Sequence, residues 1–177
     1  NRRTRYVVRV FLFLRPLVVG AVAFLPAPGS GRAGARYERI YMTFATLGLN
    51  PIVLKCLETT GYTIPTDVQR QAVPAALEGR DLLVSSHTGS GKTAAFLLPS
   101  LHKLAEPSTM PGTGPRLLVL TPTRELALQV QKQAMIYGAG MRKLRTVCLV
   151  GGAPFGPQFQ ALKVNPEVMI ATPGRLI

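Results

Sequence analysis

One stretch of the chain, Asp81 to Thr93, constrains the fold more than any other. Residues 81–85 are mostly apolar and predict a buried β-strand, residues 86–91 form a glycine-rich loop, and an apolar pattern typical of a helix begins at Thr93. A loop between a strand and a helix N-terminus directs free backbone N–H groups and the positive end of the helix dipole at one point. Such a point is suited to bind phosphate.

The side chains of this loop fit a nucleoside triphosphate. Lys92 supplies a mobile positive charge for the β- and γ-phosphates, and the Thr93 hydroxyl can reach a Mg²⁺ ion, so both are predicted catalytic residues and Thr93 is a predicted metal ligand. Ser86 stands where the strict pattern has Gly. A chance Gly-Lys-Thr in an ordinary turn is the alternative, and the flanking elements argue against it. The predicted phosphate-binding residues are Ser86, His87, Thr88, Gly89, Ser90, Gly91, Lys92 and Thr93.

Size and cysteine content narrow the class of protein. The 177 residues, 47% of them hydrophobic and 16% charged, are enough for one domain with a real core. Cys56 and Cys148 are far apart and no CxxC pair occurs, which argues against a disulfide framework or a zinc site. The default is therefore a reducing compartment.

The net charge of +13 suggests a polyanionic partner, but the charge is unevenly spread. Residues 1–41 hold eight Arg and one Glu, and the rest of the chain holds thirteen Lys and Arg against seven acids. The globular part is only moderately basic. Charge alone does not establish nucleic-acid binding.

Residues 1–41 differ in composition from the rest of the chain and are expected to lie outside the fold. Their longest uncharged apolar run, residues 17–25, is too short to span a bilayer, so no membrane partner is expected. The segment matches a secretory h-region in length and a transit peptide in being Arg-rich and acid-poor. A third interpretation is a poorly defined or artefactual extension. Because the chain starts with Asn, we expect its true start to be missing.

From Met42 onward, helical and strand patterns alternate. The patterns predict helices at residues 51–60, 68–78 (interrupted at Pro74), 93–104 and 124–137, and strands at 81–85, 116–121, 146–150 and 168–171. Short apolar strands separated by helices predict an α/β fold with a parallel sheet covered by helices on both faces. Ligands then collect at the carboxyl ends of the strands.

Three predicted strands lead into polar or glycine motifs: Pro-Thr-Arg-Glu-Leu-Ala at 122–127, Gly-Gly at 151–152 and Thr-Pro-Gly-Arg-Leu at 172–176. Together with Phe44, residues 61–69 and the phosphate loop, these motifs make the chain resemble the DEAD-box RNA helicases from about Phe44 to its last residue. The resemblance implies a RecA-like P-loop NTPase domain that binds ATP and single-stranded RNA or an RNA duplex. Residues 42–70 would be its Q-motif region, and 71–177 an ATP-binding domain that stops before the DEAD box.

The resemblance also implies an adenine site. A Gln side chain can pair with the N6 and N7 edge of adenine, and Gln69 would do so for ATP while Phe44 stacks on the ring. The alternative makes Phe44 a core residue and Gln69 a helix-surface residue.

A second set of residues would contact RNA. Arg124 follows a strand end at a helix start, which suits a phosphate contact, and Arg175 has the same position one unit later. By resemblance this surface reads the RNA backbone, which carries no base information. Ordinary turns are the alternative for each motif taken singly. The predicted RNA-binding residues are Pro122, Thr123, Arg124, Gly151, Gly152, Thr172, Pro173, Gly174 and Arg175.

The only aspartates are Asp67 and Asp81, and neither comes after a predicted strand where it could hold Mg²⁺. We therefore expect a catalytically incomplete fragment of an ATP-dependent RNA helicase of the nucleus or cytoplasm, or of an organelle if residues 1–41 are a transit peptide. A small-molecule kinase or unrelated ATPase, and a catalytically inert RNA-binding fragment, are the rival hypotheses.

Overall fold

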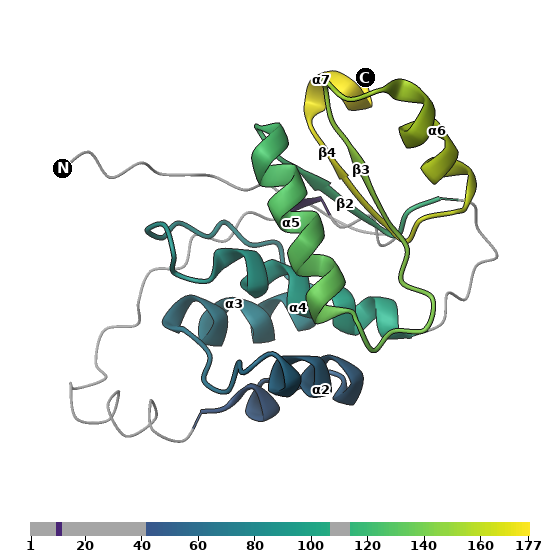
Figure 1. Ribbon diagram of the computed structural model, residues 1–177. Helices are drawn as coiled ribbons and strands as arrows, with labels where there is room; N and C mark the ends of the chain where they lie inside the picture. Colours follow the sequence, from purple (N-terminus) through teal and green to yellow (C-terminus); the bar gives the residue numbers. More distant parts are fainter. Residues whose placement is uncertain (1–9, 12–41, 107–113) are drawn as a thin grey trace.

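The computed structural model describes residues 10–11, 42–106 and 114–177 (Figure 1). Most of the predicted extension, residues 1–41, lies outside the described residues. The first half of the described chain is helical, with η1 (Phe44–Leu47), α2 (Pro51–Thr59), α3 (Asp67–Leu77) and α4 (Lys92–Ala105). The second half alternates strands and helices: β2 (Leu117–Leu120), α5 (Arg124–Tyr137), β3 (Thr146–Leu149), α6 (Phe155–Lys163), β4 (Val168–Ala171) and α7 (Pro173–Leu176).

Three parallel strands form the body of the sheet, in the order β2-β4-β3. In this register Ala171 lies beside both Leu120 and Leu149, so the carboxyl ends of the three strands are level. A two-residue strand, β1 (Val10–Phe11), pairs antiparallel along the other edge of β2. The level strand ends bring the segments that come after β2, β3 and β4 to one edge of the sheet.

Helices cover both faces of the sheet, as predicted for this α/β fold (Figure 1). Leu117 and Val119 of β2 and Ile170 of β4 face the larger core, which α2, α4 and α5 complete. Val147 and the opposite residues of the strands face a smaller cluster under α6, which contributes Ala161 and Leu162. Strict alternation along β2 and β3 separates the two sets, because successive strand side chains point to opposite faces.

The helix starts depend on capping residues that the sequence supplies. Asn50 accepts from the Ile52 N–H ahead of α2, and Thr123 accepts from Leu126 ahead of α5. Thr66 and Gln69 form a reciprocal capping box at the start of α3. The predicted interruption of this helix at Pro74 was wrong, since α3 continues through that residue to Leu77.

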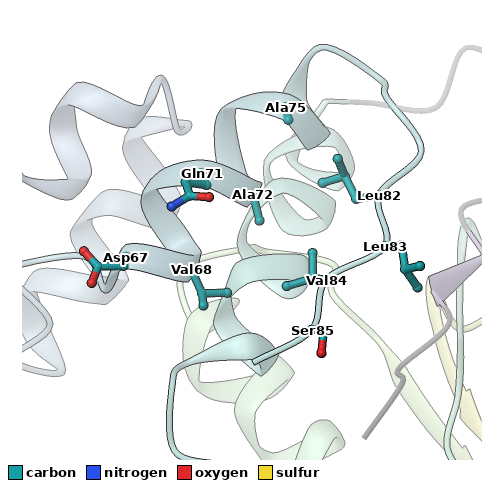
Figure 2. Close-up of a pocket in the computed structure, with 9 residues that line it drawn as sticks. All are labelled: Asp67, Val68, Gln71, Ala72, Ala75, Leu82, Leu83, Val84 and Ser85. Carbon is teal, nitrogen blue, oxygen red and sulfur yellow. The ribbon is translucent and has the colours of Figure 1, made fainter. Parts of the chain in front are cut away.

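The predicted strand at residues 81–85 is a correction. The segment is extended, but only Leu82 forms a β-bridge, and Leu83 is 63% exposed. Figure 2 shows Leu82 and Val84 directed toward α3, with Leu83 pointing away. An apolar extended segment becomes a strand only when a neighbouring strand pairs with it through a ladder of hydrogen bonds, and the apolar pattern does not specify that neighbour. Instead the segment and α3 line an open pocket of about 340 Å³.

Among the described residues, three helices were not predicted: the short 3-10 helix η1, α6 and the one-turn α7. The remaining boundaries differ from the predicted ones by one residue, and α5 and β4 match them. Within the described residues, no helix is both long and apolar enough to cross a membrane.

Candidate nucleotide-binding and nucleic-acid-binding sites

The phosphate loop, residues 86–91, turns sharply into α4. Gly89 and Gly91 have φ values of 79° and 85°, the left-handed region that favours glycine. Gly91 is the N-cap of α4, and no side chain caps this helix. The N–H groups of the first turn of α4 are therefore left for an anion, as the sequence predicts.

Lys92 folds back over the loop. Its ammonium donates to the carbonyl oxygens of Ser86 at 2.7 Å and His87 at 2.6 Å, and lies 3.4 Å from Ser90 Oγ. These contacts hold a positive charge against the loop through its oxygen atoms and do not use the backbone N–H groups of the loop. Nδ1 of the exposed His87 ring lies 2.9 Å from the neighbouring Thr88 carbonyl oxygen.

Gln69 connects the start of α3 to the phosphate loop. Its Oε1 accepts from the Thr66 N–H at 2.9 Å, and its Nε2 donates to the Gly91 carbonyl at 3.1 Å. Thr66 Oγ1 donates to the Ser90 carbonyl at 2.8 Å. Gln69 is buried, and a Cβ added at Gly91 would lie 2.4 Å from its Nε2. The structure thus gives Gln69 a role that sequence reasoning missed, in bracing the loop.

Phe44 lies in the larger core and is only 4% exposed. It also lines a hollow of about 240 Å³ together with Leu57, Tyr62 and Thr63. The position of the Phe44 ring fits a role in the core, and it also fits a contact with a molecule in the hollow. Its stacking on adenine stays a prediction.

The residues present fit ATP and Mg²⁺. The loop offers backbone donors and Lys92, and Thr93 places one hydroxyl in the first turn of α4. No group of three His, Cys, Asp or Glu side chains that could hold a metal occurs in the described part of the chain. Mg²⁺ keeps several waters and takes few protein ligands beside phosphate oxygens, so one hydroxyl suits it.

The second site lies at the carboxyl ends of the parallel strands. Arg124 begins α5 after β2, and a Cβ at Gly152 would lie only 3.2 Å from its Nη1. Gly152 has a φ of 70° and lies just after β3. Arg175, after β4, donates from Nη2 to the Ala153 carbonyl at 3.4 Å. Three predicted residues from three motifs therefore meet in one strip.

The remaining predicted RNA-binding residues surround these three. Pro122 and Thr123 are exposed at the start of α5, and Thr123 Oγ1 accepts from the Leu126 N–H at 3.3 Å. Gly151 is exposed beside Gly152, and Thr172, Pro173 and Gly174 form the start of α7. Among the described residues, no hydrogen bond joins this strip to the phosphate loop.

Gln158 of α6 holds the loop that contains the two glycines, and sequence reasoning did not single it out. Its Oε1 accepts from the Val150 N–H at 3.0 Å, and its Nε2 lies 3.2 Å from the Val150 and Pro154 carbonyls. The signal was a Gln shortly after Gly-Gly, which is too weak to interpret without the structure.

Cys148 of β3 interacts electrostatically with Arg124 of this strip. Burial raises the pKa of its thiol, and the positive charge of Arg124 opposes that rise. The thiol is therefore protonated at neutral pH.

A parallel sheet covered on both faces, a glycine loop at a helix start, and cations gathered at the strand ends define the RecA-like class of α/β nucleotide-binding domains. Residues 66–177 match the family model described as DEAD/DEAH box helicase, and the chain belongs to this family.

Similar proteins agree with this assignment. The chain is 48% identical over 135 residues to "DEAD-box ATP-dependent RNA helicase 20" of Oryza sativa, which covers 76% of this chain and 27% of the relative. It is 44% identical to "Probable ATP-dependent RNA helicase DDX59" of Homo sapiens, over 81% of this chain and 23% of the relative. The chain thus spans about a quarter of the length of these curated relatives.

A solved structure shows the same fold. The RNA helicase Prp28 of Chaetomium thermophilum, bound to ADP, superposes with a TM-score of 0.67 at 42% identity, covering 73% of this chain and 32% of that one.

Proposed function

We propose that the protein is the ATP- and RNA-binding part of an ATP-dependent RNA helicase, which couples ATP hydrolysis to the unwinding or remodelling of RNA. The observation that carries the proposal is the strip of Arg124, Gly152 and Arg175, built from three segments at one sheet edge. A phosphate loop alone would suit many enzymes. The added cationic strip supports a polyanionic partner over a small-molecule kinase substrate.

ATP binds at the phosphate loop in this proposal. The first-turn N–H groups of α4 and the Lys92 ammonium receive the β- and γ-phosphates, and Thr93 ligates Mg²⁺. Mg²⁺ supplies neutralisation of the phosphate charge that develops during transfer. Gln69 and Phe44 contact the adenine, and Gln69 links that contact to the loop through Gly91.

RNA binds along the strand-end strip through its phosphates. Arg124 and Arg175 pair with phosphate oxygens, and the exposed glycines allow the RNA backbone to approach closely. Binding does not depend on the base sequence, because phosphates carry no sequence information. We place the protein inside the cell, in the nucleus or cytoplasm, and the free thiols of Cys56 and Cys148 support this.

The nucleotide half is tested by titrating a fluorescent ATP analogue. Lys92→Ala should lose about 2–3 kcal/mol of binding free energy, the scale of a charge-assisted contact. Lys132→Ala, which removes an equal charge from an exposed position of α5, should bind as the wild type does. An unchanged dissociation constant for Lys92→Ala would remove the loop from the proposal.

The RNA half is tested by the salt dependence of single-stranded RNA binding. Arg124→Ala or Arg175→Ala should weaken all sequences alike and reduce the slope of log K against log salt by about 0.7 for each lost phosphate contact. The control is Arg142→Ala, at an exposed position that precedes β3 at the opposite end of the sheet. Loss of binding to one sequence alone would contradict a surface that contacts the backbone.

A further inference from the structure

Helix α6 carries an exposed aromatic pair beside the cationic strip. Phe155 is 64% exposed and Phe159, one turn later, is 48% exposed. Their ring centroids are 6.1 Å apart and their planes differ by 21°, so the rings are stacked on each other. Both rings present much of their surface to solvent.

The core does not require these two rings. No residue of α6 is fully buried, and the helix packs on the sheet through Ala161 and Leu162. A Phe side chain gains free energy when it leaves water. Two neighbouring rings held in solvent on one helix therefore indicate a surface that a partner covers.

Two cations extend the pair into a row. The Arg175 guanidinium lies over the Phe155 ring, 5.7 Å from its centroid, and the Lys163 ammonium lies over Phe159 at 5.1 Å. The order along the row is Arg175, Phe155, Phe159, Lys163. We call these four residues the aromatic row.

The aromatic row is continuous with the strand-end strip and is positively charged. Arg175 belongs to both, and it donates to the Ala153 carbonyl next to Gly152. Within the part of the chain that the structure describes, no carboxylate lies within ion-pair distance of Arg124, Lys163 or Arg175. An anionic partner with flat apolar groups complements this surface.

We propose that the aromatic row binds the bases of single-stranded RNA whose phosphates contact Arg124 and Arg175. This inference rests on the proposed function and adds base stacking to it. Every base has a π-face that can stack on an aromatic side chain, so the contact strengthens binding without selecting a sequence. A base stacks on the outer face of a Phe ring and displaces the cation that lies over that face. The displaced cation then pairs with an RNA phosphate.

A second copy of the chain fits the row poorly. Pairing this face with itself would bring like charges together, which disfavours association. Two rings also supply little of the roughly 800 Å² per partner that a stable interface buries. RNA satisfies the rings and the cations together.

The test compares two RNAs with the same number of phosphates. The 177-residue chain is titrated into fluorescein-labelled oligouridine of about ten nucleotides and into an abasic strand of equal length, and anisotropy is recorded. Phe155→Ala/Phe159→Ala should weaken oligouridine binding about tenfold and leave abasic binding within about twofold. Phe159→Ala alone, which keeps the ring under Arg175, should also weaken only oligouridine. Phe155→Tyr/Phe159→Tyr should retain affinity, as should Met135→Ala, an exposed apolar residue at the far end of α5.

Three outcomes would overturn the inference. Equal losses on both RNAs would mean that the rings only position Arg175. Unchanged affinity of the double variant for both RNAs, with Arg124→Ala still weakening them, would remove the stacking and leave the proposed function standing. If the double variant in that case also lost self-association in sedimentation, the row would be a contact between copies of the chain. Absence of RNA binding by the wild type would remove both proposals.

Discussion

At the scale of single residues, Gly91 has two separate reasons to be glycine. Its φ of 85° strains any residue with a Cβ, and that Cβ would also meet Gln69 Nε2 at 2.4 Å. Gly89 shares only the first reason, since its φ is 79° but nothing lies within 4 Å of its Cβ position. The two glycines thus separate backbone strain from loss of the Gln69 brace.

We expect Gly89→Ala to cost about 1 kcal/mol of unfolding free energy, the scale of left-handed strain. Gly91→Ala should cost about 1–3 kcal/mol more, because the displaced Gln69 leaves buried polar atoms unpaired. Urea unfolding measures both values. Equal costs would show that the Gln69 contact contributes nothing to holding the loop.

The adenine assignment of Gln69 makes a different prediction. Gln can complement the donor and acceptor of adenine, whereas guanine presents the wrong pattern, so ATP should displace a labelled nucleotide far better than GTP does. Gln69→Ala should narrow that gap. The ratio of the ATP affinity to the GTP affinity is the quantity to compare, because a loosened loop would weaken the binding of both nucleotides. Equal competition by GTP in the wild type would remove the assignment.

At the scale of elements, Arg116 joins three segments at the amino end of the sheet. Its guanidinium pairs with Glu167 at 2.8 Å and donates to the carbonyls of Leu104 at 2.7 Å and Glu106 at 2.9 Å. It thereby connects the end of α4, the start of β2 and the residue before β4. Both members of the ion pair are largely shielded from solvent.

Arg116→Ala should therefore lower the unfolding free energy by about 2 kcal/mol, since it leaves Glu167 and two carbonyls without their charged donor. Arg80→Ala is the control, because the Arg80–Glu78 pair is exposed and worth little. Chemical denaturation compares them. A cost for Arg116→Ala no larger than for Arg80→Ala would contradict the link between the segments.

Gln158 connects segments at the strand-end strip, as Arg116 does at the amino end of the sheet. Gln158→Ala should free the loop with Gly151 and Gly152, lowering RNA affinity about three- to tenfold through loss of hydrogen bonds worth about 1 kcal/mol each. Nucleotide affinity should not change. Gln160→Ala, an exposed position two residues on, is the matched control. A parallel loss of nucleotide binding would mean that Gln158 supports the whole fold.

The elements show what the sequence could and could not predict. Apolar patterns located α5 and β4 to the residue, because those signals are local. Helix α6 was missed because Gly156 and Pro157 lie in its first turn and look like loop residues, although proline is tolerated there. The extended segment at 81–85 was assigned to the sheet wrongly, because sheet membership depends on neighbours that the local sequence does not name.

The same distinction applies to the sites. Motifs in the sequence indicated the phosphate loop and, separately, Arg124, Gly152 and Arg175. The structure brings these three strip residues together. The supporting contacts were out of reach, because the bonds of Gln158 to Val150 and the row of Phe155 and Phe159 exist only after α6 has folded. Motifs name the groups that face a ligand, and the fold supplies the groups that hold them.

At the scale of the whole molecule, the sheet and the phosphate loop differ in how firmly they are held. Central strand β4 pairs on both sides and is buried between two clusters. The segment that leads into the loop, residues 83–87, lies beyond the single bridge at Leu82, and one of its flanks borders the open pocket beside α3 (Figure 2). Local opening is easiest where backbone hydrogen bonds are few and apolar contacts sparse.

Amide hydrogen exchange should therefore rank these regions. Residues 168–171 should exchange only through global unfolding, whereas residues 83–87 should exchange through local fluctuations and be labelled first. An ATP analogue should slow exchange in residues 86–93 while leaving β4 unchanged, because the nucleotide contacts the loop and not the sheet centre. Lys92→Ala is the control, since it should abolish that protection. Protection of residues 83–85 equal to that of β4 in the free protein would show that this segment is a full strand of the sheet, as the apolar pattern of the sequence indicates.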